Sequence, residues 1–110
     1  MITETALKRL CKPVVLRRAR RIVDSGNFIN KRKCRFDEGE TVLRARVDSH
    51  ASWEEAHRTS VVLDEASDAV VYFECDCHAA RVSDAPCDHA IAVILDYNKR
   101  PEVYDGYETK

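Results

Sequence analysis

The chain has 110 residues, of which 45% are hydrophobic and 34% are charged, and its formal net charge is −1. This length fits one domain, residues 1–110, with a modest hydrophobic core. No apolar run is long enough to cross a membrane, which excludes a membrane protein, and no secretory signal opens the chain. We therefore expect an intracellular protein, cytoplasmic or, in a eukaryote, nuclear. In such a compartment its five cysteines stay reduced.

Residues 13–26 are predicted to form a helix. Pro13 suits the first turn of a helix, and apolar residues recur at helical spacing from Val14 to Val23. Gly26 is a typical residue at which a helix ends. The apolar stripe is flanked by four arginines, Arg17, Arg18, Arg20 and Arg21. The segment is therefore expected to be a basic amphipathic helix.

Residues 28–74 are predicted to form antiparallel strands. The first two are separated by a polar turn at 37–40 that contains a glycine, and the second alternates apolar residues with arginine, so we expect a hairpin. Two further apolar runs follow at similar spacing. The four expected strands are 28–36, 41–48, 53–63 (most clearly 59–63) and 69–75.

Charge is distributed unevenly along the chain. From Leu7 to Phe36 eleven basic residues face one acid, Asp24, whereas acids outnumber bases after Phe36. Such asymmetry is what a phosphate-binding face looks like. It also fits a solvated helix face followed by a strand edge that lysine and arginine protect from pairing. Charge alone does not decide between the two interpretations.

The most informative motif is Cys75-Asp-Cys77, then nine residues, then Cys87-Asp-His89. Residues two apart in an extended strand face the same side, so both sulfurs of the first pair can point at one atom. The second pair precedes an apolar helix, whose N-terminus favours a thiolate. Two ligand pairs of this kind predict a closed tetrahedral site for one structural Zn²⁺, with ligands Cys75, Cys77, Cys87 and His89.

These residues also fit other interpretations. The cysteines can be buried thiols, and His89 an ordinary surface histidine. Disulfides fit poorly, because the number of cysteines is odd and no secretory signal is present. An iron–sulfur cluster fits less well than zinc because one ligand is histidine. His78 can replace His89 only if it turns away from its expected side of the strand, and Cys11 and Cys34 are expected to be buried or partly exposed thiols without a catalytic role.

The apolar run 90–97 is predicted to form a second helix, which ends at Arg100-Pro101. The tail from Glu102 is polar and is expected to be loose, with Tyr104 and Tyr107 able to fold back. These elements predict an α+β fold: an N-terminal helix, a small antiparallel sheet of about four strands, and a C-terminal zinc finger (75–99) with a closing helix.

The ligand pattern resembles the SWIM zinc finger family, which is defined by C-x-C, a variable spacer and C-x-H. The family is named after bacterial Swi/Snf-type helicases, Mutator-type plant transposases and MEK kinases. Ala92, three residues after His89, matches an alanine of recombination-associated members. The stretch before the finger resembles the N-terminal region of the bacterial Swi/Snf-type helicases. The resemblance implies a DNA-binding or protein-interaction module.

No catalytic residue is predicted. Four protein ligands leave no open position for a water on the metal. The zinc deaminase pattern is absent, since Pro86-Cys87 continues as Asp-His, and there is no glycine-rich phosphate loop. We therefore expect neither an enzymatic activity nor a small-molecule substrate.

Two functions from different classes remain. In the first, the chain binds nucleic acid, with DNA as the expected partner, through a basic N-terminal face composed of Arg17, Arg18, Arg20, Arg21, Lys31, Arg32, Lys33 and Arg35. Trp53 is either a stacking platform for a base or a core residue. In the second, the chain is an adaptor or subunit that docks on a helicase, transposase or recombinase through its finger helix and acidic surface. Acids beside the expected ligands, such as Asp76 and Asp88, repel phosphate and argue against contact between the finger and DNA.

Overall fold

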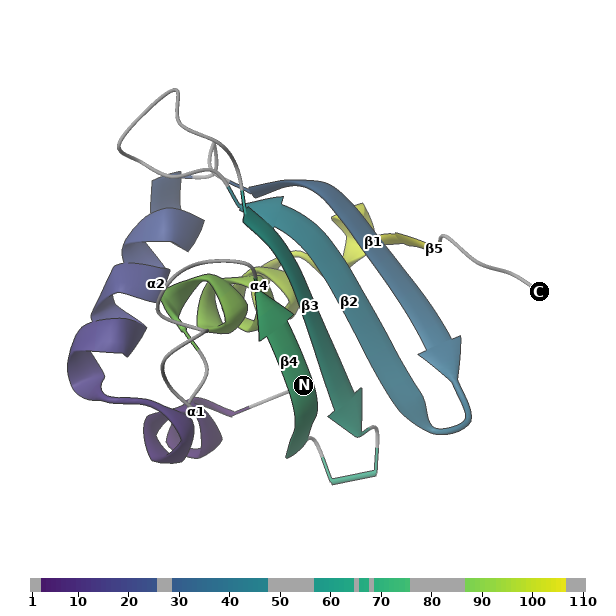
Figure 1. Cartoon of the computed structure of the whole chain (residues 1–110), viewed down its shortest axis with the longest axis horizontal. Coiled ribbons are helices and arrows are strands. Elements are labelled where there is room, and N and C mark those ends of the chain that lie inside the picture. The colour runs from purple at the N-terminus through teal and green to yellow at the C-terminus, as the bar shows by residue number, and fades with distance from the viewer. Residues whose placement is uncertain are drawn as a thin grey trace.

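The computed structural model describes residues 3–25, 29–47, 57–64, 66–67, 69–75 and 87–106. The fold is α+β, as the sequence predicts: helices, an antiparallel sheet and a C-terminal helix follow one another along the chain (Figure 1). The helical elements are α1 (Glu4–Leu10), α2 (Pro13–Ser25), α4 (Asp88–Lys99) and the 3₁₀ turn η1 (Pro101–Val103). The strands are β1 (Ile29–Asp37), β2 (Glu40–Val47), β3 (His57–Asp64), β4 (Ala69–Cys75) and β5 (Asp105–Gly106).

The two N-terminal helices have clear local causes. Helix α1, which the sequence patterns did not predict, begins after Thr3, whose hydroxyl accepts a hydrogen bond from the Ala6 amide at 3.2 Å. Helix α2 confirms the prediction over 13–26 to within one residue and begins at Pro13. Its apolar stripe is buried from Leu16 onward, Val14 at its start is exposed, and its four arginines at 17, 18, 20 and 21 are exposed. The helix is amphipathic, as expected.

The sheet is a meander with one short addition. Its strand order is β4-β3-β2-β1-β5, with antiparallel pairing from β1 to β4 and a parallel contact of β5 with β1. Between β1 and β2 the chain turns at Glu38 and Gly39, whose φ angles are 51° and 85°. Two consecutive positive φ angles are the mark of a two-residue hairpin turn whose twist matches the flanking strands. The predicted start of the third strand, at 53–56, lies outside the described residues.

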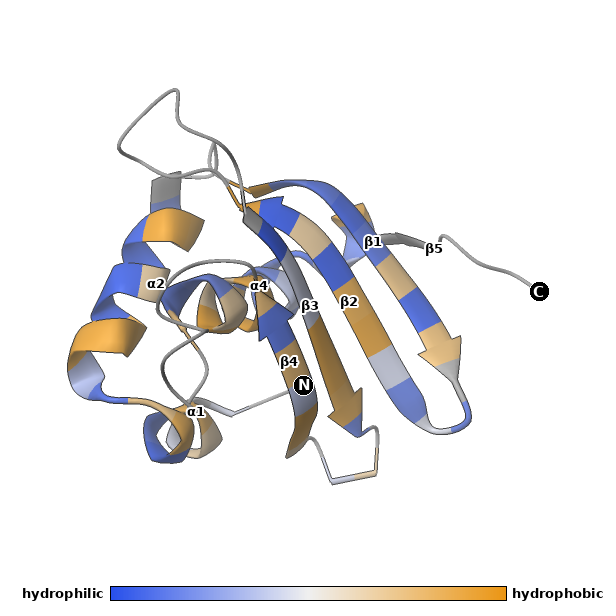
Figure 2. Cartoon of the chain, in the orientation of Figure 1, coloured by the Kyte–Doolittle hydropathy of each residue, from blue (hydrophilic) through white to orange (hydrophobic). Residues whose placement is uncertain are grey.

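Helix α4 occupies the centre of the molecule, between α2 and the sheet (Figure 1). It contacts α2 on one side and strands β2, β3 and β4 on the other. Residues Ala90 to Ile94 are all completely buried, so this part of the helix is apolar around its whole circumference. Hydrophobic segments of α2, α4 and β3 meet in this core (Figure 2).

A β-bulge in β1 redirects one of its basic side chains. Asn30 lies opposite Arg46 and Lys33 opposite Arg44, so that Lys31 and Arg32 together face Ala45 alone. Lys31 has a φ of 53°, a left-handed conformation that bends the strand. The extra residue places Arg32 on the side of the sheet that packs against α4.

Arg32 there joins a buried polar cluster around Asp96, a residue of α4 with 0% exposure. Arg32 Nε donates to Asp96 Oδ2 at 2.7 Å and the Tyr104 hydroxyl donates to the same oxygen at 2.8 Å. Arg100 Nη1 donates to Asp96 Oδ1. Burial, and secondarily the Asp96 charge, raise the pKa of Tyr104, which therefore remains a donor at physiological pH. Tyr104 thus folds back, as the sequence allows, whereas Tyr107 lies outside the described residues.

Candidate metal centre

Cys75 is the last residue of β4 and points into the core. It lies opposite Thr59 of β3, and both side chains are buried, with exposures of 8% and 1%. The other inward residues of these strands, such as Val61 and Phe73, also pack in or against the core. The alternation of the strand therefore fixes the Cys75 thiol on the side of the sheet where α4 begins.

Cys87 and His89 come from the start of α4. Cys87 is the N-cap residue, and its carbonyl accepts the first helical hydrogen bond, from Ile91 N at 3.1 Å. Its thiol is buried and makes no capping bond to the helix. The partial positive charge at a helix N-terminus stabilises a thiolate, which is the form that binds metals. His89, in the first helical turn, is half-buried.

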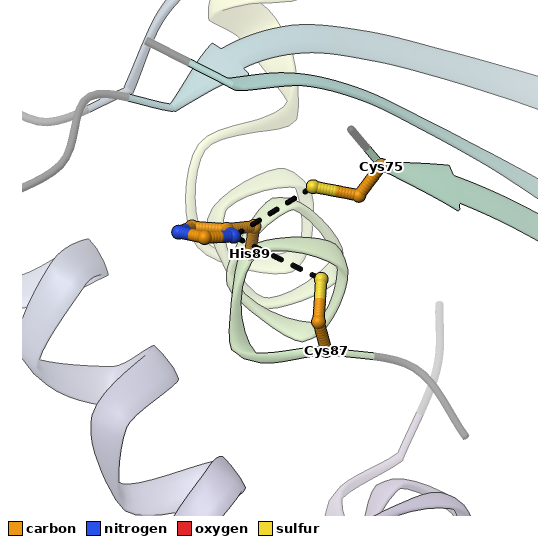
Figure 3. Close-up of side chains that lie close together, drawn as sticks. All are labelled: Cys75, Cys87 and His89. Atoms are coloured by element: carbon orange, nitrogen blue, oxygen red, sulfur yellow. Dashed lines mark hydrogen bonds between the residues drawn. The ribbon is translucent and has the colours of Figure 1, made fainter. Parts of the chain in front are cut away.

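The three side chains converge on one point (Figure 3). His89 Nδ1 lies 3.6 Å from Cys75 Sγ and 3.9 Å from Cys87 Sγ, and all three ligand atoms lie within 4.8 Å of one another. With Zn–S bonds of about 2.3 Å and Zn–N bonds of about 2.0 Å, a tetrahedral ion holds sulfur and nitrogen roughly 3.5 Å apart. The donor set and its spacing therefore fit a metal ion.

Two residues outside the predicted ligand set lie beside this centre. The Thr59 hydroxyl is 3.4 Å from Cys75 Sγ, close enough to donate a hydrogen bond to a thiolate. Asp88 Oδ1 is 3.7 Å from His89 Nδ1, so the centre carries an acid at its half-buried edge. Sequence reasoning missed Thr59 because it is sixteen residues from Cys75 and only the strand register brings the two together.

We expect Thr59→Val to lower the affinity of the centre for zinc about tenfold. The substitution keeps the volume of the side chain but removes the hydroxyl that stabilises the Cys75 thiolate. Competition with a chromophoric zinc chelator measures the effect. Ser60→Ala, on the opposite face of the same strand, is the matched control and should leave the affinity unchanged. Equal affinities for the wild type and Thr59→Val would show that the hydroxyl does not support the ligand.

The fourth predicted ligand, Cys77, lies outside the described residues, as do His78 and the spacer up to Pro86. Among the cysteines that the structure describes, Cys11, Cys34, Cys75 and Cys87, no disulfide forms. Cys34 is buried and Cys11 half-buried, as the sequence predicts. Burial raises the pKa of Cys11, which makes it a poor nucleophile.

The basic residues proposed as one nucleic-acid face lie on separate surfaces. Arg17, Arg18, Arg20 and Arg21 are exposed on α2, which α4 separates from the sheet. Lys33 and Arg35 lie on the opposite side of β1 from the buried Cys34, and hence on the face of the sheet turned away from α4. Lys31 is exposed at the bulge, and Arg32 is ion-paired with Asp96. Although these residues are close in the sequence, they do not form one continuous surface in the structure.

No helix among the described residues is long and apolar enough to cross a membrane. Comparisons of the chain with protein-family models, with curated proteins and with solved structures gave no match.

Proposed function

We propose that the chain is a non-catalytic zinc-binding module of the SWIM type, in which Cys75, Cys77, Cys87 and His89 hold one structural Zn²⁺. The convergence of two buried sulfurs and one imidazole nitrogen at the spacing of a tetrahedral ion carries this proposal. A fourth protein ligand closes the coordination shell, which leaves no position for a reacting water.

The metal joins two elements that the core needs. One ligand ends β4 and two begin α4, so the ion fastens the buried helix to the sheet on which it packs. Structural zinc contributes roughly 10–16 kcal/mol of apparent binding free energy in finger peptides. This is comparable to the whole stability of a domain of this size, about 5–15 kcal/mol.

We further propose that the module binds nucleic acid through basic side chains on its surface. The exposed arginines of α2 and the exposed lysines of β1 supply positive charge on elements other than those that carry Asp88 and the metal centre. The ligand cluster itself is buried and bordered by an acid, which favours a supporting role for the metal over contact with phosphate. Phosphate contacts of this type give affinity without sequence preference.

Fluorescence anisotropy of labelled oligonucleotides, with protein of measured zinc content, tests this function. We expect micromolar binding at low salt and a linear fall of the logarithm of the binding constant with the logarithm of salt concentration. The zinc-loaded, folded protein should be compared with the same protein after chelation, which should lose binding together with its fold. Absence of binding by the zinc-loaded protein at low salt would favour the adaptor, a partner of a helicase, transposase or recombinase.

A further inference from the structure

The face of the sheet turned away from α4 carries a compact group of cations. Lys33, Arg44, Arg46 and Arg58 are all exposed, and each alternates with a residue that faces the core side. None of the described helices packs on this face, and blue segments of β1 and β2 run side by side along it (Figure 2). We refer to these four residues as the basic sheet patch. Arg44, Arg46 and Arg58 were not among the predicted binding residues.

The strand register places like charges directly opposite one another in this patch. Lys33 pairs with Arg44 and Arg46 with Arg58, and the outer neighbours of the two pairs are the uncharged Ser60 and Asn30. Directly opposed like charges destabilise a sheet. Of the acids on this face, Glu40 and Asp64 oppose each other at the other end of β2 and β3, whereas Glu74 of β4 lies opposite Ser60, beside the patch. The patch thus gathers four cations in two directly opposed pairs, an arrangement that a bound anion would stabilise.

An apolar row crosses the same face beside the patch. Val42, Val62 and Tyr72 lie opposite one another on β2, β3 and β4, and Val42 is buried and Val62 half-buried. Tyr72 is 55% exposed. Val42 lies two residues from Arg44 on β2, roughly 7 Å away. Tyr72 lies two strands and two residues from Arg44, roughly 12 Å away, and two residues from Glu74 on its own strand. An exposed aromatic ring on the same face as a group of cations is the combination that binds unpaired bases and their phosphates.

We propose that this face binds a single strand of nucleic acid, with phosphates on the basic sheet patch and a base stacked on Tyr72. The inference rests on the proposed nucleic-acid function and identifies its surface and ligand. A duplex presents its phosphates but keeps its bases paired and stacked, so it cannot use Tyr72. Phosphates and base faces are common to DNA and RNA, and the site therefore binds both without discrimination.

The exposed arginines of α2 are the competing surface. Among the described residues of α2, Val14 is the sole large hydrophobic residue that is exposed. The helix contains no aromatic residue. That surface offers charge alone. The sheet offers charge together with a stacking platform, and this difference is what the experiment measures.

Anisotropy titrations of oligothymidine, oligouridine and a mixed-sequence duplex test the proposal with zinc-loaded protein. The double variant Arg46→Ala/Arg58→Ala should bind both single strands on the order of tenfold more weakly and lower the salt slope by about 1.4. Tyr72→Ala should weaken binding roughly 5- to 150-fold, and Tyr72→Phe should retain it.

Lys8→Ala/Arg9→Ala, which removes the same charge from α1, is the matched control and should bind like the wild type. Thermal melting verifies that each variant is folded.

The outcomes separate this inference from the proposed function. Absence of binding by the wild type overturns both. If the wild type binds but Arg17→Ala/Arg18→Ala loses more affinity than Arg46→Ala/Arg58→Ala, nucleic-acid binding stands and the sheet site is wrong. Tighter binding of duplex than of single strands, or unchanged binding by Tyr72→Ala, also overturns the sheet site. A preference for one of the two sugars would contradict the expected absence of discrimination.

Discussion

Cys87→Ser should yield an insoluble or molten protein. The substitution removes a buried ligand at the start of α4, and with it most of the roughly 10–16 kcal/mol that a structural zinc contributes. Because α4 is the centre of the core, its release exposes apolar surface on both α2 and the sheet. Near-ultraviolet circular dichroism, thermal melting and zinc content measured on the same sample report the result.

Cys11→Ser is the matched control for this experiment. The Cys11 thiol is half-buried, donates to the Leu7 carbonyl at 3.4 Å and takes no part in the metal centre. Its replacement should change the melting temperature little and leave the zinc content at one ion per chain. A soluble Cys87→Ser protein with the melting temperature of the wild type would show that the metal does not support the fold.

Asp96→Ala should lower the free energy of unfolding by about 3 kcal/mol. It leaves the Arg32 and Arg100 guanidinium groups facing a cavity without their carboxylate, and deprives the buried Tyr104 hydroxyl of its nearer acceptor. Removal of one member of a buried ion pair typically costs about 3–5 kcal/mol, because the remaining charge is desolvated and unpaired. Here the two arginines are partly exposed, which places the expected loss at the lower end. Urea unfolding at constant zinc concentration measures it.

Lys99→Ala supplies the comparison from the same helix. Lys99 Nζ lies 3.8 Å from Asp24 Oδ1, and both side chains are more than half exposed. An exposed ion pair contributes about 0–1 kcal/mol, so this variant should be nearly as stable as the wild type. If Asp96→Ala were no more destabilising than Lys99→Ala, the Asp96 cluster would not stabilise the fold.

The secondary structure could be predicted to a large extent because it depends on local patterns. Apolar spacing and Pro13 locate α2, the alternation over 41–48 and the turn at Gly39 locate the hairpin, and the apolar run after His89 locates α4. The ligand pattern likewise identifies Cys75, Cys87 and His89, which the structure brings together. Helix α1 and strand β5 were missed because each is short, at seven and two residues, and is held by contacts with the rest of the fold.

Features that depend on tertiary contacts could not be predicted. Lysine has no preference for a positive φ, so the bulge at Lys31 leaves no signal in the sequence. The pairing of Arg32 with Asp96 spans 64 residues, and a count of charges assigned Arg32 to a basic face. Counting charges along the chain also did not identify Arg44, Arg46 and Arg58 as a group. Only the strand register shows that Arg44 lies opposite Lys33 and Arg46 opposite Arg58. The alternation of arginine with apolar residues in β2 was the available clue.

The position of α4 also determines when the protein can fold during synthesis. The apolar stripe of α2 and the inner face of the sheet are translated first, but the helix that covers both is encoded after residue 87. Until that segment leaves the ribosome, the earlier part of the chain has little to bury its apolar side chains against, and two of the proposed metal ligands are missing. We expect the nascent chain to depend on chaperones up to this point, and its core to close in one late, metal-dependent step.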